Sequence, residues 1–104
     1  MAVTSKTLAR TSAATTSTTL YTQPNTTTTT VLTNMLVTNT TTSAATFSLV
    51  IAGVTAAASV AIPANDTTVI DMKQVIPPTS PAATIAGSAS TTAVNFHISG
   101  VEIS

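Results

Sequence analysis

The side chains able to perform acid–base chemistry are few in this sequence. His97 is the only histidine, and Asp66, Asp71 and Glu102 are the only acids. A Ser–His–Asp arrangement could be drawn from His97, Asp71 and a serine, but nothing in the spacing of these residues supports it. We therefore expect no catalytic residue, and we predict that the protein is not an enzyme.

Binding sites for metals, cofactors and phosphate are equally poorly supplied. The chain has no cysteine and one histidine, whereas zinc and iron sites commonly need three or four His, Cys or carboxylate ligands. Its three glycines are scattered, so they do not form a loop that could cradle a phosphate. We predict no metal ligand, no cofactor-binding residue and no cofactor.

Charge and hydropathy argue against two classes of partner. Three basic residues and one tyrosine do not make a nucleic-acid-binding patch. The uncharged run from Phe47 to Ala64 is about as long as the shortest membrane span, but it contains Gly53 and Pro63 and has no flanking Lys or Arg. A strand, a turn near Ala52-Gly53 and a second strand explain this run better, and we expect neither nucleic acid nor membrane as a partner.

The composition favours a small β protein that associates. A chain of 104 residues is expected to form one domain, and its zero net charge leaves little repulsion to keep it expanded. Thr, Val and Ile favour strands. Large apolar side chains are sparse and disulfides are impossible without cysteine, so we expect the protein to gain stability in a homo-oligomer or a larger assembly.

The longest ordered pattern runs from Thr26 to Ile51. Thr29, Val31, Thr33, Met35 and Val37 alternate along an extended chain, which predicts a strand with these residues on one face. The polar segment 39–43 then predicts a turn, after which Ala45, Phe47, Leu49 and Ile51 alternate again. The simplest interpretation is a hairpin of two paired strands.

Shorter strands surround this predicted hairpin. Thr67 to Ile76 alternates as one strand, Pro77 to Pro81 predicts a loop or sheet edge, and Gly87-Ser88 predicts a turn. Further strands are expected at 14–21, 59–62, 83–86 and 94–99. The sequence thus predicts an all-β fold: a single small antiparallel β-sandwich, jelly-roll or Ig-like, with about eight short strands spanning residues 13–104.

The two ends of the chain supply the candidate partner interface. Residues 1–12 are predicted to form an N-terminal arm outside the sandwich, in which Lys6 and Arg10 reach an acidic neighbour and Leu8 anchors the contact; a frayed terminus is the alternative. Near the other end, Val101 and Ile103 take the parity opposite to Val94, Phe96 and Ile98. Either Gly100 marks a bulge, which we prefer, or Val101 and Ile103 face another chain.

Several stretches together resemble a family of small virion structural proteins of tailed bacteriophages. Their order along the chain carries the resemblance, and they are Thr19-Leu20-Tyr21-Thr22 with Pro24, Val37-Thr38-Asn39-Thr40, 44–49 (AATFSL), 70–76 (IDMKQVI) and 94–103 (VNFHISGVEI). The resemblance implies a β-sandwich subunit of the virion without enzymatic activity, acting in capsid decoration, the neck or the tail.

The partners that this resemblance implies are copies of the chain itself, as a trimer or a ring, and other virion proteins such as capsid, neck or tail subunits. The alternative is a carbohydrate-binding or adhesion module of a phage appendage. Glycan sites commonly use aromatic platforms, and Tyr21, Phe47 and Phe96 are the only aromatic residues. This scarcity weighs against adhesion.

Overall fold

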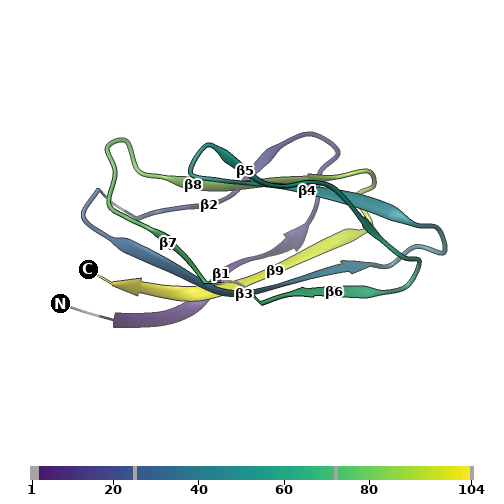
Figure 1. Cartoon of the computed structure of the whole chain (residues 1–104), viewed down its shortest axis with the longest axis horizontal. Helices are drawn as coiled ribbons and strands as arrows, with labels where there is room; N and C mark the ends of the chain where they lie inside the picture. Colours follow the sequence, from purple (N-terminus) through teal and green to yellow (C-terminus); the bar gives the residue numbers. More distant parts are fainter. Residues whose placement is uncertain (1–2, 25, 72, 104) are drawn as a thin grey trace.

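The computed structural model describes residues 3–24, 26–71 and 73–103, which fold into two packed antiparallel sheets (Figure 1). The first sheet has the order β1-β9-β3-β6, with β7 also pairing with β3, and the second has the order β2-β8-β4-β5. The strands are β1 (Val3–Ser12), β2 (Thr18–Thr22), β3 (Thr29–Asn39), β4 (Ala45–Ile51), β5 (Val54–Ile62), β6 (Thr67–Ile70), β7 (Gln74–Ile76), β8 (Thr84–Ala89) and β9 (Val94–Ile103). The predicted all-β antiparallel sandwich is therefore confirmed, with nine strands in the described residues.

The core lies between the sheets and is built by alternation. Val94, Phe96 and Ile98 of β9 are fully buried, and Phe47 and Leu49 of β4 face them from the second sheet. The Phe47 and Phe96 rings meet edge to face, with centroids 6.2 Å apart and planes at 76°. This geometry is a favourable one for aromatic pairs, and it joins the two sheets at the centre of the molecule.

The predicted hairpin across Thr26–Ile51 is wrong. Its two strands exist as β3 and β4, but they belong to different sheets. β3 instead lies between β9 and the short strands β6 and β7, whereas β4 lies between β8 and β5. The hairpin that does form is β4–β5, whose turn at Ala52 and Gly53 has φ of 51° and 81°, the left-handed values that suit a two-residue turn.

The β4–β5 hairpin lies in the segment from Phe47 to Ala64, for which the sequence predicted a strand, a turn and a second strand. The described part of the chain contains no helix that could span a membrane. The predicted strand from Thr67 to Ile76 is divided into β6 and β7, with Met72 outside the described residues. Gly87 and Ser88, predicted as a turn, lie inside β8.

The N-terminal arm predicted for residues 1–12 is also wrong, because residues 3–12 form β1, an edge strand of the first sheet. This strand pairs with β9 from Val3 opposite Ile103 to Ser12 opposite Asn95. Leu8 and Ala9 are each 7% exposed and belong to the core. The predicted boundary at residue 12 therefore does not separate an arm from the sandwich.

Two bulges lie near Gly100, in the strands on either side of β9. The register shifts at Thr33 in β3, opposite the step from Ser99 to Gly100, and at Leu8 in β1, opposite the step from Ile98 to Ser99. β9 itself keeps its alternation, so the preferred interpretation of Gly100 as a bulge is wrong. Before the bulge in β3 the even positions Thr30 and Leu32 are buried, and after it the odd positions Met35 and Val37 are buried. The prediction that one set of alternate residues forms a single face along the whole strand is therefore wrong.

Close approach explains why residue 100 is glycine. A Cβ there would overlap the carbonyl oxygen of Val31 and lie 2.8 Å from Leu8 Cδ1. We expect Gly100→Ala to lower the free energy of unfolding by about 2 kcal/mol, because the backbone of β3 must shift. Ser99→Ala, on the outer face of the same strand, should change it by less than about 0.5 kcal/mol. Urea denaturation of both variants checks this, and equal effects would contradict it.

Candidate functional site

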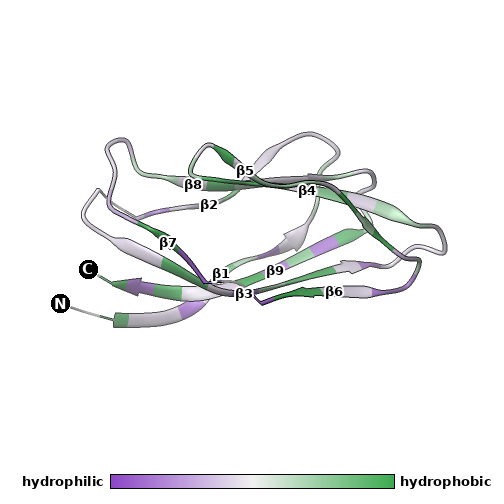
Figure 2. Cartoon of the chain, viewed as in Figure 1, coloured by the Kyte–Doolittle hydropathy of each residue, from purple (hydrophilic) through white to green (hydrophobic). Residues whose placement is uncertain are grey.

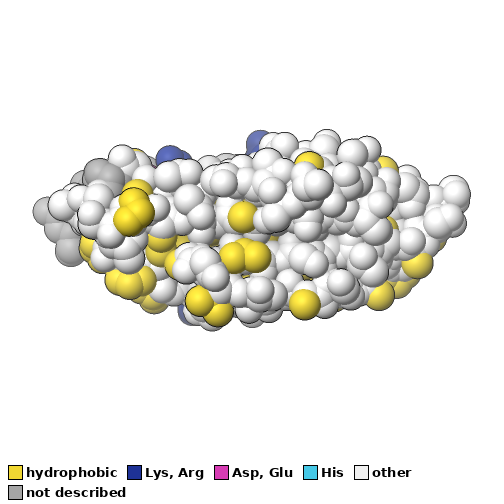
Figure 3. Space-filling model, turned by 90° about the horizontal axis from the view of Figure 1, so that it is seen from above, with side chains coloured by type: hydrophobic (Ala, Val, Ile, Leu, Met, Phe, Trp, Pro, Cys, Tyr) yellow, Lys and Arg dark blue, Asp and Glu magenta, His cyan; other side chains and the backbone are white. Residues whose placement is uncertain are grey.

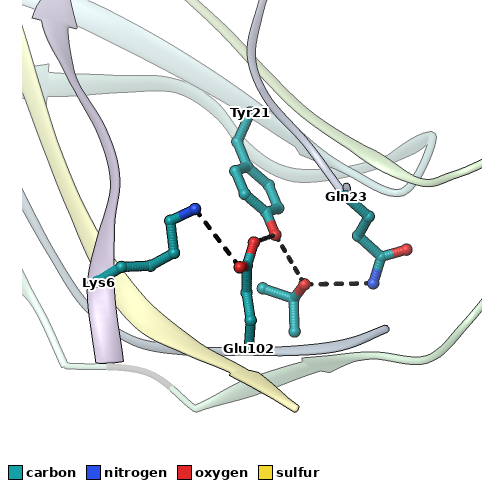
Figure 4. Close-up of polar contacts among 5 residues, drawn as sticks. Lys6, Tyr21, Gln23 and Glu102 are labelled. Carbon is teal, nitrogen blue, oxygen red and sulfur yellow. Dashed lines mark hydrogen bonds and ion pairs between the residues drawn. The ribbon is translucent and has the colours of Figure 1, made fainter. Parts of the chain in front are cut away.

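A chain of polar side chains crosses the sandwich near the start of β1 and the end of β9 (Figure 4). Glu102 of β9 accepts a hydrogen bond of 2.5 Å from the Tyr21 hydroxyl of β2, and its other carboxylate oxygen lies 3.4 Å from Lys6 Nζ of β1. β2 belongs to the second sheet, whereas β1 and β9 belong to the first. These contacts therefore tie the two sheets together.

The network continues inward through hydroxyl and amide groups. Gln23 Nε2 donates to Thr30 Oγ1 at 3.3 Å, and Thr30 Oγ1 lies 2.9 Å from the Tyr21 hydroxyl. Because the tyrosine proton is given to Glu102, the Thr30 hydroxyl is the donor to Tyr21. The result is one consistent direction of donation, from Gln23 through Thr30 and Tyr21 to Glu102, with Lys6 compensating the final charge.

Gln23 fixes the loops at this end of the molecule. Its amide nitrogen also donates to the backbone carbonyls of Thr28 at 3.1 Å and Ile76 at 3.0 Å, and its oxygen accepts from the Ala83 amide at 3.3 Å. The side chain is 2% exposed, and no buried side-chain polar atom in the described residues lacks a partner. A buried amide with all its contacts made stabilises one loop arrangement.

Burial, followed by the hydrogen bond to Glu102, raises the pKa of Tyr21 from 10.0 to about 12. The phenol therefore stays protonated at neutral pH and acts as a donor, not as a base. The network holds one carboxylate, Glu102, which accepts from Tyr21 and is paired with Lys6. No group of three or more His, Cys, Asp or Glu residues in the described ranges could hold a metal ion.

The raised Tyr21 pKa predicts a loss of stability at high pH. The unfolded phenol loses its proton near pH 10, whereas the folded one keeps it until about pH 12. The stabilisation that the protonated Tyr21 phenol gives the folded state is complete below pH 10 and is lost as the pH rises through this window. The resulting decrease in the free energy of unfolding approaches roughly 2 kcal/mol near pH 12. Urea denaturation between pH 8 and 12 should show this loss in the wild type and a smaller one in Tyr21→Phe; parallel curves would contradict the prediction.

The structure uses the predicted arm residues within their own chain. Lys6 pairs with Glu102, Leu8 is buried in the core, and Arg10 is exposed with one long contact of 3.4 Å to Thr7 Oγ1. Leu8 as an anchor on a neighbour is therefore wrong. Sequence reasoning missed Tyr21 and Glu102 as a pair, although Glu102 shares the parity of the buried residues of β9, which indicates an acid that needs an internal partner.

Val101 and Ile103 lie on the outer face of the first sheet, because Glu102 between them points inward to Tyr21. Val3 lies opposite Ile103, and Val31 lies opposite both Val101 and Val75. We call these five residues, Val3, Val31, Val75, Val101 and Ile103, the end patch. Figure 2 shows hydrophobic segments at the start of β1, in β7 and at the end of β9, all at the same end of the molecule.

A groove of about 410 Å³ adjoins the end patch at β7. Its lining comes from the β4–β5 hairpin, including Ile51 and Val54, and from residues 74–77, including Val75. Val54 is 71% exposed and Val75 is 62% exposed. Apolar surface therefore continues from the first sheet across its edge to the second.

The four strands of the second sheet contain no Lys, Arg, Asp, Glu or His. Figure 3 looks onto this sheet and shows Lys and Arg only along its two long edges, with no acidic or histidine side chain in view. Its outward positions on β4 and β8 are Thr46, Ser48, Val50, Thr84, Ala86 and Ser88. This face offers small, uncharged side chains for packing and no charged group for catalysis.

These features define a class, an antiparallel β-sandwich with nine strands in the described residues and an internal polar network. Solved structures of similar fold include chains of a virus particle. A crystal structure of the T13 particle of infectious bursal disease virus contains a chain similar to this one, with a TM-score of 0.55 and 14% identity over 97% of this chain. A structure of the Gx strain of the same virus gives a TM-score of 0.54 at 14% identity, again over 97% of this chain.

The chain spans 30% of the length of each virus chain that it matches. At 14% identity the similarity is one of fold. No protein-family model matches the sequence, and no curated protein matches it at a significant level.

Proposed function

We propose that this chain is a non-enzymatic structural protein of a virion, which binds the particle as an oligomer and stabilises or decorates it. The observation that carries the proposal is the similarity of nearly the whole sandwich to part of a chain in a virus particle. The absence of charge from the second sheet supports it, because a small uncharged face suits packing against other subunits more than substrate binding.

The finer proposal follows from the sequence resemblance to structural proteins of tailed bacteriophages. In that setting the chain acts as capsid decoration, or as an accessory of the neck or tail. Copies of the same chain, as a trimer or ring, and capsid, neck or tail subunits are its partners. The virion is its location.

Burial of the aromatic residues favours this role over glycan adhesion. Tyr21 is 7% exposed, Phe47 is 1% exposed and Phe96 is fully buried, and these are all the aromatic residues of the chain. None can offer a ring face to a sugar. The Tyr21 hydroxyl is also occupied by Glu102 and Thr30.

Electron microscopy of particles with and without the protein tests the proposal. We expect particles that carry it to show additional density of sandwich size on the head, neck or tail, and particles that lack it to lose that density or to be less stable on heating. Identical particles in both preparations, with the protein recovered only in the unbound fraction, would overturn the proposal.

A further inference from the structure

We infer that the outer face of the first sheet binds an acidic segment of a different virion protein, through a row of four side chains: Arg10, His97, Leu36 and Val69. We call these four residues the Arg10 row. The inference deepens the proposed function, on which it rests, by naming the chemistry of one partner. It depends on strand register, on a positive charge without an ionic partner and on the aliphatic side chains beside that charge.

Strand register places the four residues side by side. Arg10 of β1 lies opposite His97 of β9, and His97 lies opposite Leu36 of β3. Leu36 in turn lies opposite Val69 of β6. The residues on either side of His97 along β9 are buried, so the row points away from the core. Neighbouring strands lie about 4.8 Å apart, which makes the row roughly 14 Å long from β1 to β6.

Arg10 supplies the charge of the row, and within the described residues it forms no ion pair. Its guanidinium makes one hydrogen bond, from Nη2 to Thr7 Oγ1 at 3.4 Å. Asp66 and Asp71 flank β6, three strands away from β1, and Glu102 faces the other side of the sheet. A guanidinium forms paired, charge-assisted hydrogen bonds with a carboxylate. A carboxylate from outside the chain is therefore the group that matches this end of the row.

The other three residues define the rest of the partner. His97 is half-buried, and its ring carries an N–H donor in either tautomer. Leu36 is 37% exposed and Val69 is 63% exposed, so the far end of the row is aliphatic. In an extended segment, residues four positions apart lie on the same face and about 13 Å from each other. An acidic residue followed four positions later by an aliphatic one therefore spans the row.

A polypeptide matches the row better than a nucleic acid. Nucleic-acid binding neutralises several phosphates with a patch of basic groups, whereas the row contains one arginine. The two lysines of the chain lie elsewhere: Lys6 is paired with Glu102 on the other side of the sheet, and Lys73 lies between β6 and β7. The exposed aliphatic side chains of the row have no counterpart in a phosphate backbone.

The acids of a second copy also match the row poorly. Asp71 is followed two positions later by Lys73, and both are exposed, so this acid would bring a like charge toward Arg10. Asp66 accepts a hydrogen bond from a backbone amide in its own turn, and Glu102 faces the other side of the sheet. These three are all the acids of the chain. A different protein is therefore the better source of the carboxylate.

The chain offers a matched control for a test of the charged end. Lys73 is an exposed basic residue, as Arg10 is, but it lies near the opposite edge of the sheet. Arg10→Glu and Lys73→Glu therefore change the net charge by the same amount and differ in position. Glutamate at position 10 also keeps a charge on the edge strand β1, so the variant does not leave that edge open to aggregation.

Titration of the full chain with a short peptide, followed by NMR of the backbone amides, measures the effect. The probe is Thr-Glu-Thr-Val-Thr-Leu with both ends blocked, and its control carries Gln in place of Glu. We expect shifts at the β9 amides around His97, binding at least tenfold weaker in Arg10→Glu and less than twofold weaker in Lys73→Glu. The Gln peptide should bind at least threefold more weakly. No shifts at millimolar peptide, or equal weakening by both variants, would overturn the inference.

The aliphatic end gives a second test that does not depend on the folding of Arg10→Glu. Val69→Glu places a carboxylate where the row takes an aliphatic side chain, and it should weaken binding of the probe at least threefold. Val75→Glu is the control, because Val75 is 62% exposed on β7 and lies outside the row, opposite Val31. Equal effects of the two substitutions would contradict the inference. Circular dichroism of each variant checks that it is folded.

Binding of wild type and variants to purified particles separates this inference from the proposed function. Peptide binding that Arg10→Glu weakens, without any binding to particles, supports the row and counts against the virion role. Particle binding that Arg10→Glu leaves unchanged supports the virion role and overturns the inference. Tighter binding of oligothymidine than of the peptide would assign the row to nucleic acid, and self-association that Arg10→Glu removes would assign it to a second copy. Either result overturns the inference.

Discussion

Phe47→Ala is expected to lower the free energy of unfolding by about 3 to 5 kcal/mol, the range for deleting a buried phenylalanine ring. The Phe47 side chain is 1% exposed at the centre of β4, and its ring packs edge to face against Phe96 of the opposite sheet. Its removal leaves a cavity between the two sheets that small neighbours such as Gly87 and Ala89 cannot fill. Urea denaturation at 25 °C, followed by circular dichroism, measures the loss.

Thr46→Ala is the matched control, because Thr46 is the preceding residue of β4 and lies on the outer face of the second sheet. It should change the free energy of unfolding by less than about 0.5 kcal/mol. The double variant with Phe96→Ala should show a coupling of about 1 kcal/mol between the two rings. Equal losses in Phe47→Ala and Thr46→Ala would contradict the assignment of Phe47 to the inward face and Thr46 to the outward face of β4.

The face of β4 could be predicted from the sequence because its alternation is unbroken. Ala45, Phe47 and Leu49 occupy alternate positions, and all three are buried. The same holds for Val94, Phe96 and Ile98 of β9. Where a strand has no bulge, its period of two determines which side chains enter the core.

The face of β3 could not be predicted in this way. An extra residue at Thr33 shifts the buried set from even to odd positions. Leu32 and Met35 therefore both point inward, although they are an odd number of positions apart and regular alternation would place them on opposite faces. The sequence of β3 gives no local signal of the bulge. Its position depends on the pairing with Ser99 and Gly100, which are more than 60 residues away in the sequence.

Sequence distance also hid the polar network. Tyr21 and Glu102 are 81 residues apart, and Lys6 and Glu102 are 96 apart. The sequence indicates that β1 carries basic residues, but it does not show that β1 is the neighbour of β9. The parity of Val101 and Ile103 is enough to predict that they face away from the core. Their position next to Val3, Val31 and Val75 could not be predicted, because it depends on which strands are neighbours in the sheet.

One buried side chain makes many of the contacts at the crossing from β3 to β4. Asn39, at the end of β3, is fully buried, and its Nδ2 donates to the carbonyls of Ser43 at 2.8 Å, Ile62 at 3.2 Å and Pro63 at 3.2 Å. Its Oδ1 accepts from the amide and hydroxyl of Thr41 at 3.0 and 2.8 Å. These contacts turn the chain away from the first sheet, and they explain why β3 and β4 do not pair as a hairpin.

Asn39→Ala is therefore expected to cost about 2 to 4 kcal/mol, because buried carbonyls of the β5 end and the crossing segment lose their donor. Asn95→Ala is the control: Asn95 pairs with the neighbouring residue Thr38 but lies half-exposed on the outer face. Its loss should stay below about 0.5 kcal/mol. Urea denaturation of both variants measures the difference.

Asn39→Asp tests the direction of the hydrogen bonds. Aspartate keeps the acceptor for Thr41 but directs a carboxylate at the carbonyl oxygens of Ser43, Ile62 and Pro63, so burial and repulsion should raise the pKa of the new carboxyl in the folded state. Its ionisation then destabilises the fold as the pH rises above about 4, the ordinary value for aspartate. The deficit of Asn39→Asp relative to the wild type should be larger at pH 7 than at pH 3. A deficit that does not change with pH would show that the side chain at position 39 does not face these carbonyls.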